Sequence, residues 1–179
     1  MSAPSVDLVP FAPAEQPRDL SLAGTAGRDG GFLRVRFRLQ GVPALVDLSG
    51  AVGAGTRRDG LWSGTCFEAF VAVEGGHGYA EVNLAPSRDW NVYLFDGYRS
   101  GMRPDPSVSD LQRSTDLVEG TLTASFSLPL ASLAPADRVL EVGLAAVIRH
   151  ADGRLGHWAL AHPGDRPDFH RREGFLLRR

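Results

Sequence analysis

Acidic and amide side chains that could act on a polar ligand gather between Leu61 and Phe95. Glu68, Glu81 and Asn83 alternate with apolar residues in two strand-like runs of this stretch. Two glutamates can act as general acid and general base in glycoside hydrolysis. A sheet face that carries carboxylates, an amide and aromatic rings can instead bind a polar ligand, or it can be ordinary solvated surface. The residue types alone leave these three interpretations open.

The strands that would position these side chains form a predicted β-hairpin. Residues 65–74 and 79–85 alternate in polarity and are joined by the glycine-rich segment 75–78, which is typical of a hairpin turn. If Glu74 pairs with Tyr79, each face can be read from the period of two. One face is then wholly apolar and suited to a core. The other carries Glu68, Phe70, Glu74, Tyr79, Glu81 and Asn83.

The same pairing argues against a catalytic carboxylate pair. It places Glu81 opposite Ala72, four residues from Glu68, which is about 13 Å along a strand. Glycosidases need their carboxyl groups about 5–5.5 Å apart for retention and about 6.5–9.5 Å for inversion. A shift of two residues would change this distance. In the register considered, the sequence favours a protein without catalytic activity.

The rest of the chain predicts an all-β protein. The clearest strand is 32–40, in which Leu33, Val35, Phe37 and Leu39 alternate with three arginines, the pattern of a half-buried strand. About ten short strands separated by glycine-rich turns are typical of an antiparallel β-sandwich of the jelly-roll kind. The other expected strands are 5–11, 44–48, 89–96, 111–119, 121–128, 139–150 and 155–160, with turns at 27–31 and 49–60.

Length, charge and composition narrow the class of protein. The 179 residues fit one domain spanning residues 1–179. A net charge of −2 argues against nucleic acid as a partner. No run approaches the roughly 20 apolar residues of a membrane helix, and residues 1–16 lack the pattern of a signal peptide. We therefore expect no membrane association and a cytoplasmic location.

Four ordered motifs carry a resemblance to a known family. They are LW-x3-CFE-x-F from Leu61, Y-x-E-x-N-x-x-P from Tyr79, W-x-x-Y-x-F from Trp90, and GHW-x-L-x-HP from Gly156. In this order they resemble the bacterial DOMON-like domains, which are related to family 9 carbohydrate-binding modules. The similarity runs from Leu61 to the C-terminus. It implies an antiparallel β-sandwich, in agreement with the strand pattern.

The resemblance also implies a sugar site. In sugar-binding members a tryptophan and a glutamate six residues later contribute to the site, which matches Trp62 and Glu68, and Trp158 would supply a second aromatic wall. Sugar rings stack on aromatic surfaces, and polar side chains bind their hydroxyls. Leu155 departs from the family pattern, which has a polar residue three before the late tryptophan. The alternative is that both tryptophans belong to the core. The expected polar contacts are Glu68, Glu81, Asn83, Tyr93 and Arg99.

Other functions stay open at this point. Haem-binding relatives use axial methionine and histidine, types that Met102 and four histidines (His150, His157, His162 and His170) could supply. The spacing of His157, His162 and His170 with Asp165 and Asp168 fits no common zinc pattern. Cys66 has no assignable base, so it is interpreted as a small apolar residue. We expect non-catalytic binding of a small glycan, with no cofactor and no metal. A protein-interaction module is the main alternative.

Overall fold

Antiparallel strands make up most of the regular structure in the computed structural model, which describes residues 3–42, 44–48 and 55–179. The strands are β1 (Val6–Pro10), β2 (Ser21–Asp29), β3 (Phe32–Gln40), β4 (Cys66–Val73), β5 (Tyr79–Leu84), β6 (Trp90–Phe95), β7 (Arg103–Pro104), β8 (Gln112–Val118), β9 (Thr121–Pro129), β10 (Leu140–Arg149), β11 (Leu155–Ala159) and β12 (Leu177–Arg178). Three short 3-10 helices, η1 (Pro13–Glu15), η2 (Leu61–Ser63) and η3 (Arg172–Gly174), lie between them. The predicted all-β fold is confirmed.

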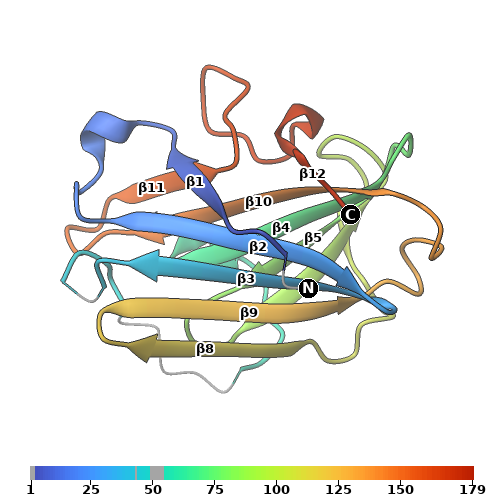
Figure 1. Ribbon diagram of the computed structural model, residues 1–179, viewed down its shortest axis with the longest axis horizontal. Helices are drawn as coiled ribbons and strands as arrows, with labels where there is room; N and C mark the ends of the chain where they lie inside the picture. Colours follow the sequence, from blue (N-terminus) through green and yellow to red (C-terminus); the bar gives the residue numbers. More distant parts are fainter. Residues whose placement is uncertain (1–2, 43, 49–54) are drawn as a thin grey trace.

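The strands form two packed layers joined through β1. Along the hydrogen-bonded path the order is β7-β6-β5-β4-β10-β11-β1-β2-β3-β9-β8, and β12 pairs with β10. The first half of β1 pairs with β2 at Val6–Leu8, and its end pairs with β11 at Val9 and Pro10. In Figure 1, β2, β3, β9 and β8 lie in front of β10, β4 and β5. This curled sheet is the expected antiparallel sandwich.

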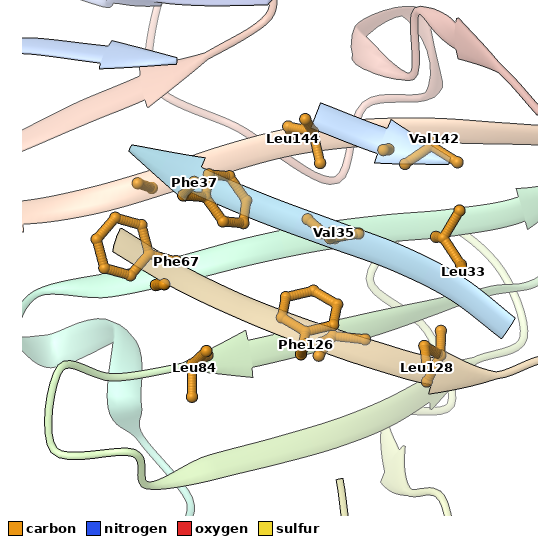
Figure 2. Packing of buried hydrophobic residues seen from close by; sticks show 14 of the residues in the cluster. Leu33, Val35, Phe37, Phe67, Leu84, Phe126, Leu128, Val142 and Leu144 are labelled. Carbon is orange, nitrogen blue, oxygen red and sulfur yellow. The ribbon is translucent and has the colours of Figure 1, made fainter. Parts of the chain in front are cut away.

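The core lies between the two layers and follows the period of two. Leu33, Val35 and Phe37 of β3 are at most 2% exposed, and the arginines between them are exposed. Figure 2 shows these side chains facing Phe67 and Leu144 of the other layer. The rings of Phe37 and Phe67 are 5.3 Å apart. Each such burial contributes about 1.5–3 kcal/mol, so this interior fixes which face of every strand points outward.

The register of the β4–β5 hairpin differs by two residues from the predicted one. Phe70, not Ala72, is opposite Glu81, and Glu68 is opposite Asn83. The cause lies in the turn: the N–H of Gly76 donates to the carbonyl of Val73, so β4 ends at Val73 and the loop is longer than expected. A shift of two residues keeps every side chain on its predicted face. It brings Glu81 closer to Glu68.

Two other sequence expectations need correction. Gly27 was expected in a turn, but β2 continues through it to Asp29, with Gly30 taking the positive φ of the turn. Residues 44–48 were expected as a strand and contribute one bridge, from Val46 to His150. Residues 49–54 of the expected loop 49–60 lie outside the described residues. Within the described part of the chain, no helix is long and apolar enough to span a membrane.

The outer face of the β4–β5–β10 layer is covered by the C-terminal segment. Phe70 projects from this face and contacts Phe175, with 5.7 Å between the ring centroids, and Phe169 at 6.4 Å. Tyr79 and Phe95 stack beside them at 4.7 Å. The face that carries the predicted polar residues is therefore neither open surface nor core. A covering segment leaves part of it accessible.

Candidate functional site

A pocket of about 360 Å³ opens on this outer face. Its floor includes Glu68 of β4 and Glu81 of β5, and Trp62 of η2 and Arg99 of the β6–β7 loop stand at its walls. The structure therefore brings four of the seven predicted site residues together. Strands β6, β10 and β11 contribute one residue each to the remaining wall. The residues of the remaining wall are Phe95 (β6), Val147 (β10), His157 (β11), Met102 of the β6–β7 loop, and Pro167, Asp168, Phe169 and His170 of the C-terminal segment.

The two glutamates are almost completely buried at the floor of the pocket. Glu68 is 3% exposed and Glu81 is 4% exposed. Asn83, fully buried, donates from Nδ2 to Glu81 Oε1 at 2.9 Å. Glu68 Oε1 has no hydrogen-bond partner among the described residues. An unpartnered buried carboxyl oxygen is costly, and it belongs to a side chain that lines the pocket.

Burial changes the protonation of both glutamates. Loss of water raises the pKa of Glu68 well above its usual value, and the nearby charge of Glu81 raises that pKa further. Burial also raises the pKa of Glu81, against the opposing effects of the Asn83 hydrogen bond and the Arg99 charge. Two neighbouring buried carboxyl groups do not readily ionise together. The pair therefore favours a state that holds a proton.

Arg99 is held at the rim by Asp168. Its Nη2 donates to Asp168 Oδ1 at 2.9 Å, and the Tyr98 hydroxyl donates to the other oxygen of the same carboxylate. Burial tends to raise the pKa of Asp168, but the hydrogen bonds from Tyr98 and Arg99 outweigh it and lower this pKa. Asp168 is thus charged at neutral pH and positions the guanidinium beside the pocket.

A hydrogen-bonded chain fixes the ring of His170 at the pocket wall. The backbone N–H of Arg99 donates to the Tyr79 hydroxyl oxygen at 3.3 Å, and Tyr79 Oη lies 2.7 Å from His170 Nδ1. Burial, then the charge of Arg99, lowers the pKa of His170 to about 4, so the ring is neutral at pH 7. With Tyr79 donating to Nδ1, the ring proton sits on Nε2, which lies 3.9 Å from Glu81 Oε2.

The rings of Trp62 and Tyr93 are in contact, but only Trp62 lines the pocket. Trp62 is 41% exposed, whereas Tyr93 is buried beneath it in an edge-to-face contact at 6.0 Å. The Tyr93 hydroxyl donates to Asp59 Oδ1 at 2.8 Å. Tyr93 was expected to contact the ligand, but it does not line the pocket, and its position suits it to support the Trp62 indole. Asn83 likewise acts through Glu81.

Trp158 lies on the opposite side of the sheet from the pocket. It pairs with Ala146 of β10, whose neighbour in β4 is Phe67, a core residue. Trp158 is 4% exposed within the core cluster. The expectation that Trp158 forms a second wall facing Trp62 is therefore corrected. His157, one residue earlier and so on the other face, lines the pocket instead.

The sequence interpretation missed the contribution of the C-terminal segment. Residues 161–179 form a segment that supplies Asp168, Phe169 and His170 to the pocket, whereas the sequence suggested Asp168 and His170 only as possible metal or haem ligands. The one available signal was Phe169, an aromatic residue between two polar ones. No periodic pattern links such a loop to a particular strand. Its placement depends on long-range packing against Phe70.

The residues considered for haem or metal are divided between this pocket and other places. Met102, His157 and His170 line the pocket, whereas His150 bonds through Nε2 to Gln16 and His162 to the carbonyl of Val9. No cluster of three or more potential metal ligands occurs in the described residues. Cys66 is buried beside Glu68, and burial, followed by the Glu68 charge, raises the pKa of its thiol. That thiol is poorly suited to act as a nucleophile.

The corrected register also changes the argument about catalysis. Glu68 and Glu81 are diagonal neighbours across the hairpin, a relation that places Cβ atoms about 7–8 Å apart at most. The expected separation of about 13 Å was therefore wrong. A glycosidase, however, needs one carboxylate charged and the other protonated. Here the pKa values of both groups are shifted towards the neutral form.

Three larger hollows among the described residues contain none of the predicted site residues. One, of about 710 Å³, lies on the outer face of the β2–β3–β9 layer beside Arg34 and Arg36. The second, of about 620 Å³, shares Asp168 and His170 with the pocket, and the third, of about 430 Å³, lies beside Leu133 and Leu140. The smaller pocket is the one that combines buried carboxyl groups with an accessible indole.

Comparison with known proteins supports the fold. A crystal structure from Bacteroides uniformis, of a protein to which carbohydrate binding has been attributed, matches 97% of this chain and 84% of its own, with a TM-score of 0.74 and 12% identity. A family 9 carbohydrate-binding module from Caldicellulosiruptor kristjanssonii, solved with cellotriose, matches 82% of this chain and 68% of its own, with a TM-score of 0.51 and 9% identity. No protein-family model matches the chain, and no curated protein matches its sequence.

Proposed function

We propose that this protein binds a small carbohydrate in the Trp62 pocket and does not convert it. One observation carries the proposal: a partly exposed indole stands beside two buried carboxyl groups, one of which has an unpartnered oxygen. Aromatic faces stack on the C–H faces of sugar rings, and carboxyl groups hydrogen-bond to sugar hydroxyls. Both elements of sugar recognition are present within one pocket.

The size and polarity of the pocket suit a small glycan. Its volume of about 360 Å³ lies at the lower end of the roughly 300–1,000 Å³ that is usual for small-molecule sites. Glu68 and Glu81 offer buried polar contacts, and the exposed edge of Arg99 offers a further donor at the rim. A ring that stacks on Trp62 would direct its hydroxyls towards the two glutamates.

The structural neighbours support this proposal in general terms. One is a carbohydrate-binding module in complex with cellotriose, and the other has carbohydrate binding attributed to it. The motifs that begin at Leu61, Tyr79 and Gly156 resemble the DOMON-like domains related to the same module family. We infer a DOMON-like relationship on that basis. The altered second wall implies that the mode of sugar binding differs from the family pattern.

A tryptophan-fluorescence titration against monosaccharides and short oligosaccharides tests the proposal. A saturable change with one class of sugar, lost in Trp62→Ala but kept in Phe32→Ala, supports it; Phe32 is a comparably exposed aromatic residue on the other layer. An absorption spectrum checks the same sample for haem. A flat response across the panel, together with a defined complex on pulldown, would instead indicate a protein-interaction module.

A further inference from the structure

The two glutamates that line the pocket form no ion pair with an arginine among the described residues. Asp168 is neutralised by Arg99 at 2.9 Å. Glu68 has no ion-pair partner among the described residues, and the nearest one for Glu81 is His170 at 3.9 Å, whose ring is neutral at pH 7. Two buried carboxyl groups thus face the pocket without a resident cation. Glu68 Oε1, on a side chain that is 3% exposed, is also unpartnered.

We propose that the carbohydrate bound here is an amino sugar, whose protonated amine lies between Glu68 and Glu81. This inference rests on the proposed carbohydrate function and specifies the class of sugar. An ammonium group supplies three N–H donors, of which one would reach Glu68 Oε1 and another Glu81 Oε2. A neutral hydroxyl offers one donor only. The floor of the pocket therefore discriminates between an amine and a hydroxyl at one ring position.

The walls of the pocket suit a cation as well as a ring. Trp62, Phe95 and Phe169 line it, and aromatic faces attract ammonium groups by about 0.5–2 kcal/mol, depending on exposure. Arg99 would repel an amine, but its charge is directed to Asp168 at the rim. Trp62 can stack on the ring while the amine reaches the floor.

Proton linkage gives the amino sugar a distinct signature. The empty pocket holds a proton on the glutamate pair, because burial raises both pKa values and the charge of Glu81 raises the pKa of Glu68 further. An ammonium group stabilises the charged carboxylates, so its binding releases that proton and tightens as the pH rises. A neutral sugar has no charge that would stabilise ionised carboxylates, so its binding should release no proton. The other titratable groups at or beside the pocket are Cys66, Tyr79, Tyr98, Arg99, His157, Asp168 and His170.

Matched pairs of sugars test the inference. Calorimetry would compare glucosamine with glucose and N-acetylglucosamine, and galactosamine and mannosamine with their neutral parents, at pH 5.5 and 7. At pH 7 we expect one amino sugar to bind at least about tenfold more tightly than its neutral parent, equivalent to about 1.4 kcal/mol. Proton release, measured in buffers of different ionisation enthalpy, should accompany that binding and be absent for the neutral sugar.

Glu68→Gln should abolish the preference for the amine, so that the ratio of the affinity for the amino sugar to the affinity for its neutral parent falls from about tenfold to about one. Glu15→Gln is the matched control and should keep the preference, because Glu15 lies in the exposed 3-10 helix η1 and does not line the pocket. Glu81→Gln provides a second variant if Glu68→Gln does not fold, and the pH dependence of the wild-type protein needs no variant.

The outcomes separate this inference from the proposed function. Neutral sugars that bind as tightly as their amino counterparts, or an N-acetylated sugar that matches the free amine, would overturn the amino-sugar assignment and leave carbohydrate binding standing. No binding of any sugar would overturn both.

Discussion

Glu68 and Glu81 are diagonal neighbours across the β4–β5 pair, since Glu68 is opposite Asn83 and Glu81 lies two residues along the same strand. Both side chains leave the core on the outer face of the layer, and the C-terminal segment covers that face. The fold therefore holds two acidic groups together in a poorly solvated place. This arrangement costs stability, which is consistent with a site kept for binding.

The cost should be visible in how stability depends on pH. The pKa of Glu68 is raised in the folded protein, above the value of about 4.3 expected in the unfolded chain. The contribution of Glu68 to the free energy of unfolding is therefore complete below the unfolded pKa, and it is lost as the pH rises through the folded pKa. Glu68→Gln removes the titration, so the variant should gain stability relative to wild type between pH 5 and pH 8. Urea unfolding across this range measures the difference, and parallel pH profiles for the two proteins would contradict the prediction.

Trp62→Ala should remove binding at little cost in stability. The indole is 41% exposed and rests on Tyr93, so the free energy of unfolding should fall by no more than about 1 kcal/mol, as for surface changes. Trp158→Ala is the contrasting variant, because it removes a core side chain and should cost about 3–5 kcal/mol. Chemical denaturation measures both. Severe destabilisation by Trp62→Ala would show that Trp62 is structural and would remove it from the site.

The sequence was sufficient to predict the fold because the strand pattern is strong. The alternation of Leu33, Val35 and Phe37 with arginines determines which face of β3 is buried, and the same logic placed Glu68 and Glu81 on one outer face. Gly27 was harder to interpret, because a glycine inside a strand resembles a turn. At Gly24 a Cβ would lie 2.8 Å from Leu144 Cδ1, a close approach between layers that the sequence does not reveal.

Strand periodicity placed Glu68 and Glu81 on one face, whereas Trp62 and Arg99 lie outside the strands, in η2 and in the β6–β7 loop. Trp62, Glu68, Glu81 and Arg99 line one pocket. Trp158 was placed wrongly because the family resemblance, and not the alternation of β11, suggested its role; alternation from His157 puts Trp158 inward. Asp168 and His170 come from a loop of 17 residues between β11 and β12. Contacts of such a segment depend on tertiary packing, which local pattern does not encode.

His170 should make the folded protein sensitive to mild acid. Burial lowers its pKa to about 4, whereas an unfolded histidine titrates near about 6.5. The unfolded state therefore binds a proton between these values while the folded state does not, and stability falls as the pH drops from about 6.5 to about 4. His170→Gln should reduce this loss, and His77→Gln, on the exposed hairpin loop, should leave it unchanged. Thermal unfolding at half-unit pH intervals tests this, and an equal acid sensitivity in His170→Gln would contradict it.

Arg99 combines a charged contact with an unfavourable backbone conformation, and the two can be separated. Its φ of 50° lies in the left-handed region, which costs a non-glycine residue about 1–2 kcal/mol. Arg99→Ala and Arg99→Gly both remove the contact to Asp168, but only glycine relieves the backbone. We therefore expect Arg99→Gly to be more stable than Arg99→Ala by about 1 kcal/mol, with the affinity for a neutral sugar reduced in both because the donor at the rim is lost.

Arg88 supplies the matched control for this comparison. Its φ of 70° is also left-handed, and it lies in the turn between β5 and β6, outside the pocket. Arg88→Gly should likewise exceed Arg88→Ala in stability, while both variants keep the wild-type affinity for ligand. Urea unfolding and calorimetric titration of the four variants give the two readouts. If the Arg99 variants retained full affinity, the guanidinium would not contact the ligand, and its role would be limited to holding Asp168 and the C-terminal segment over the sheet.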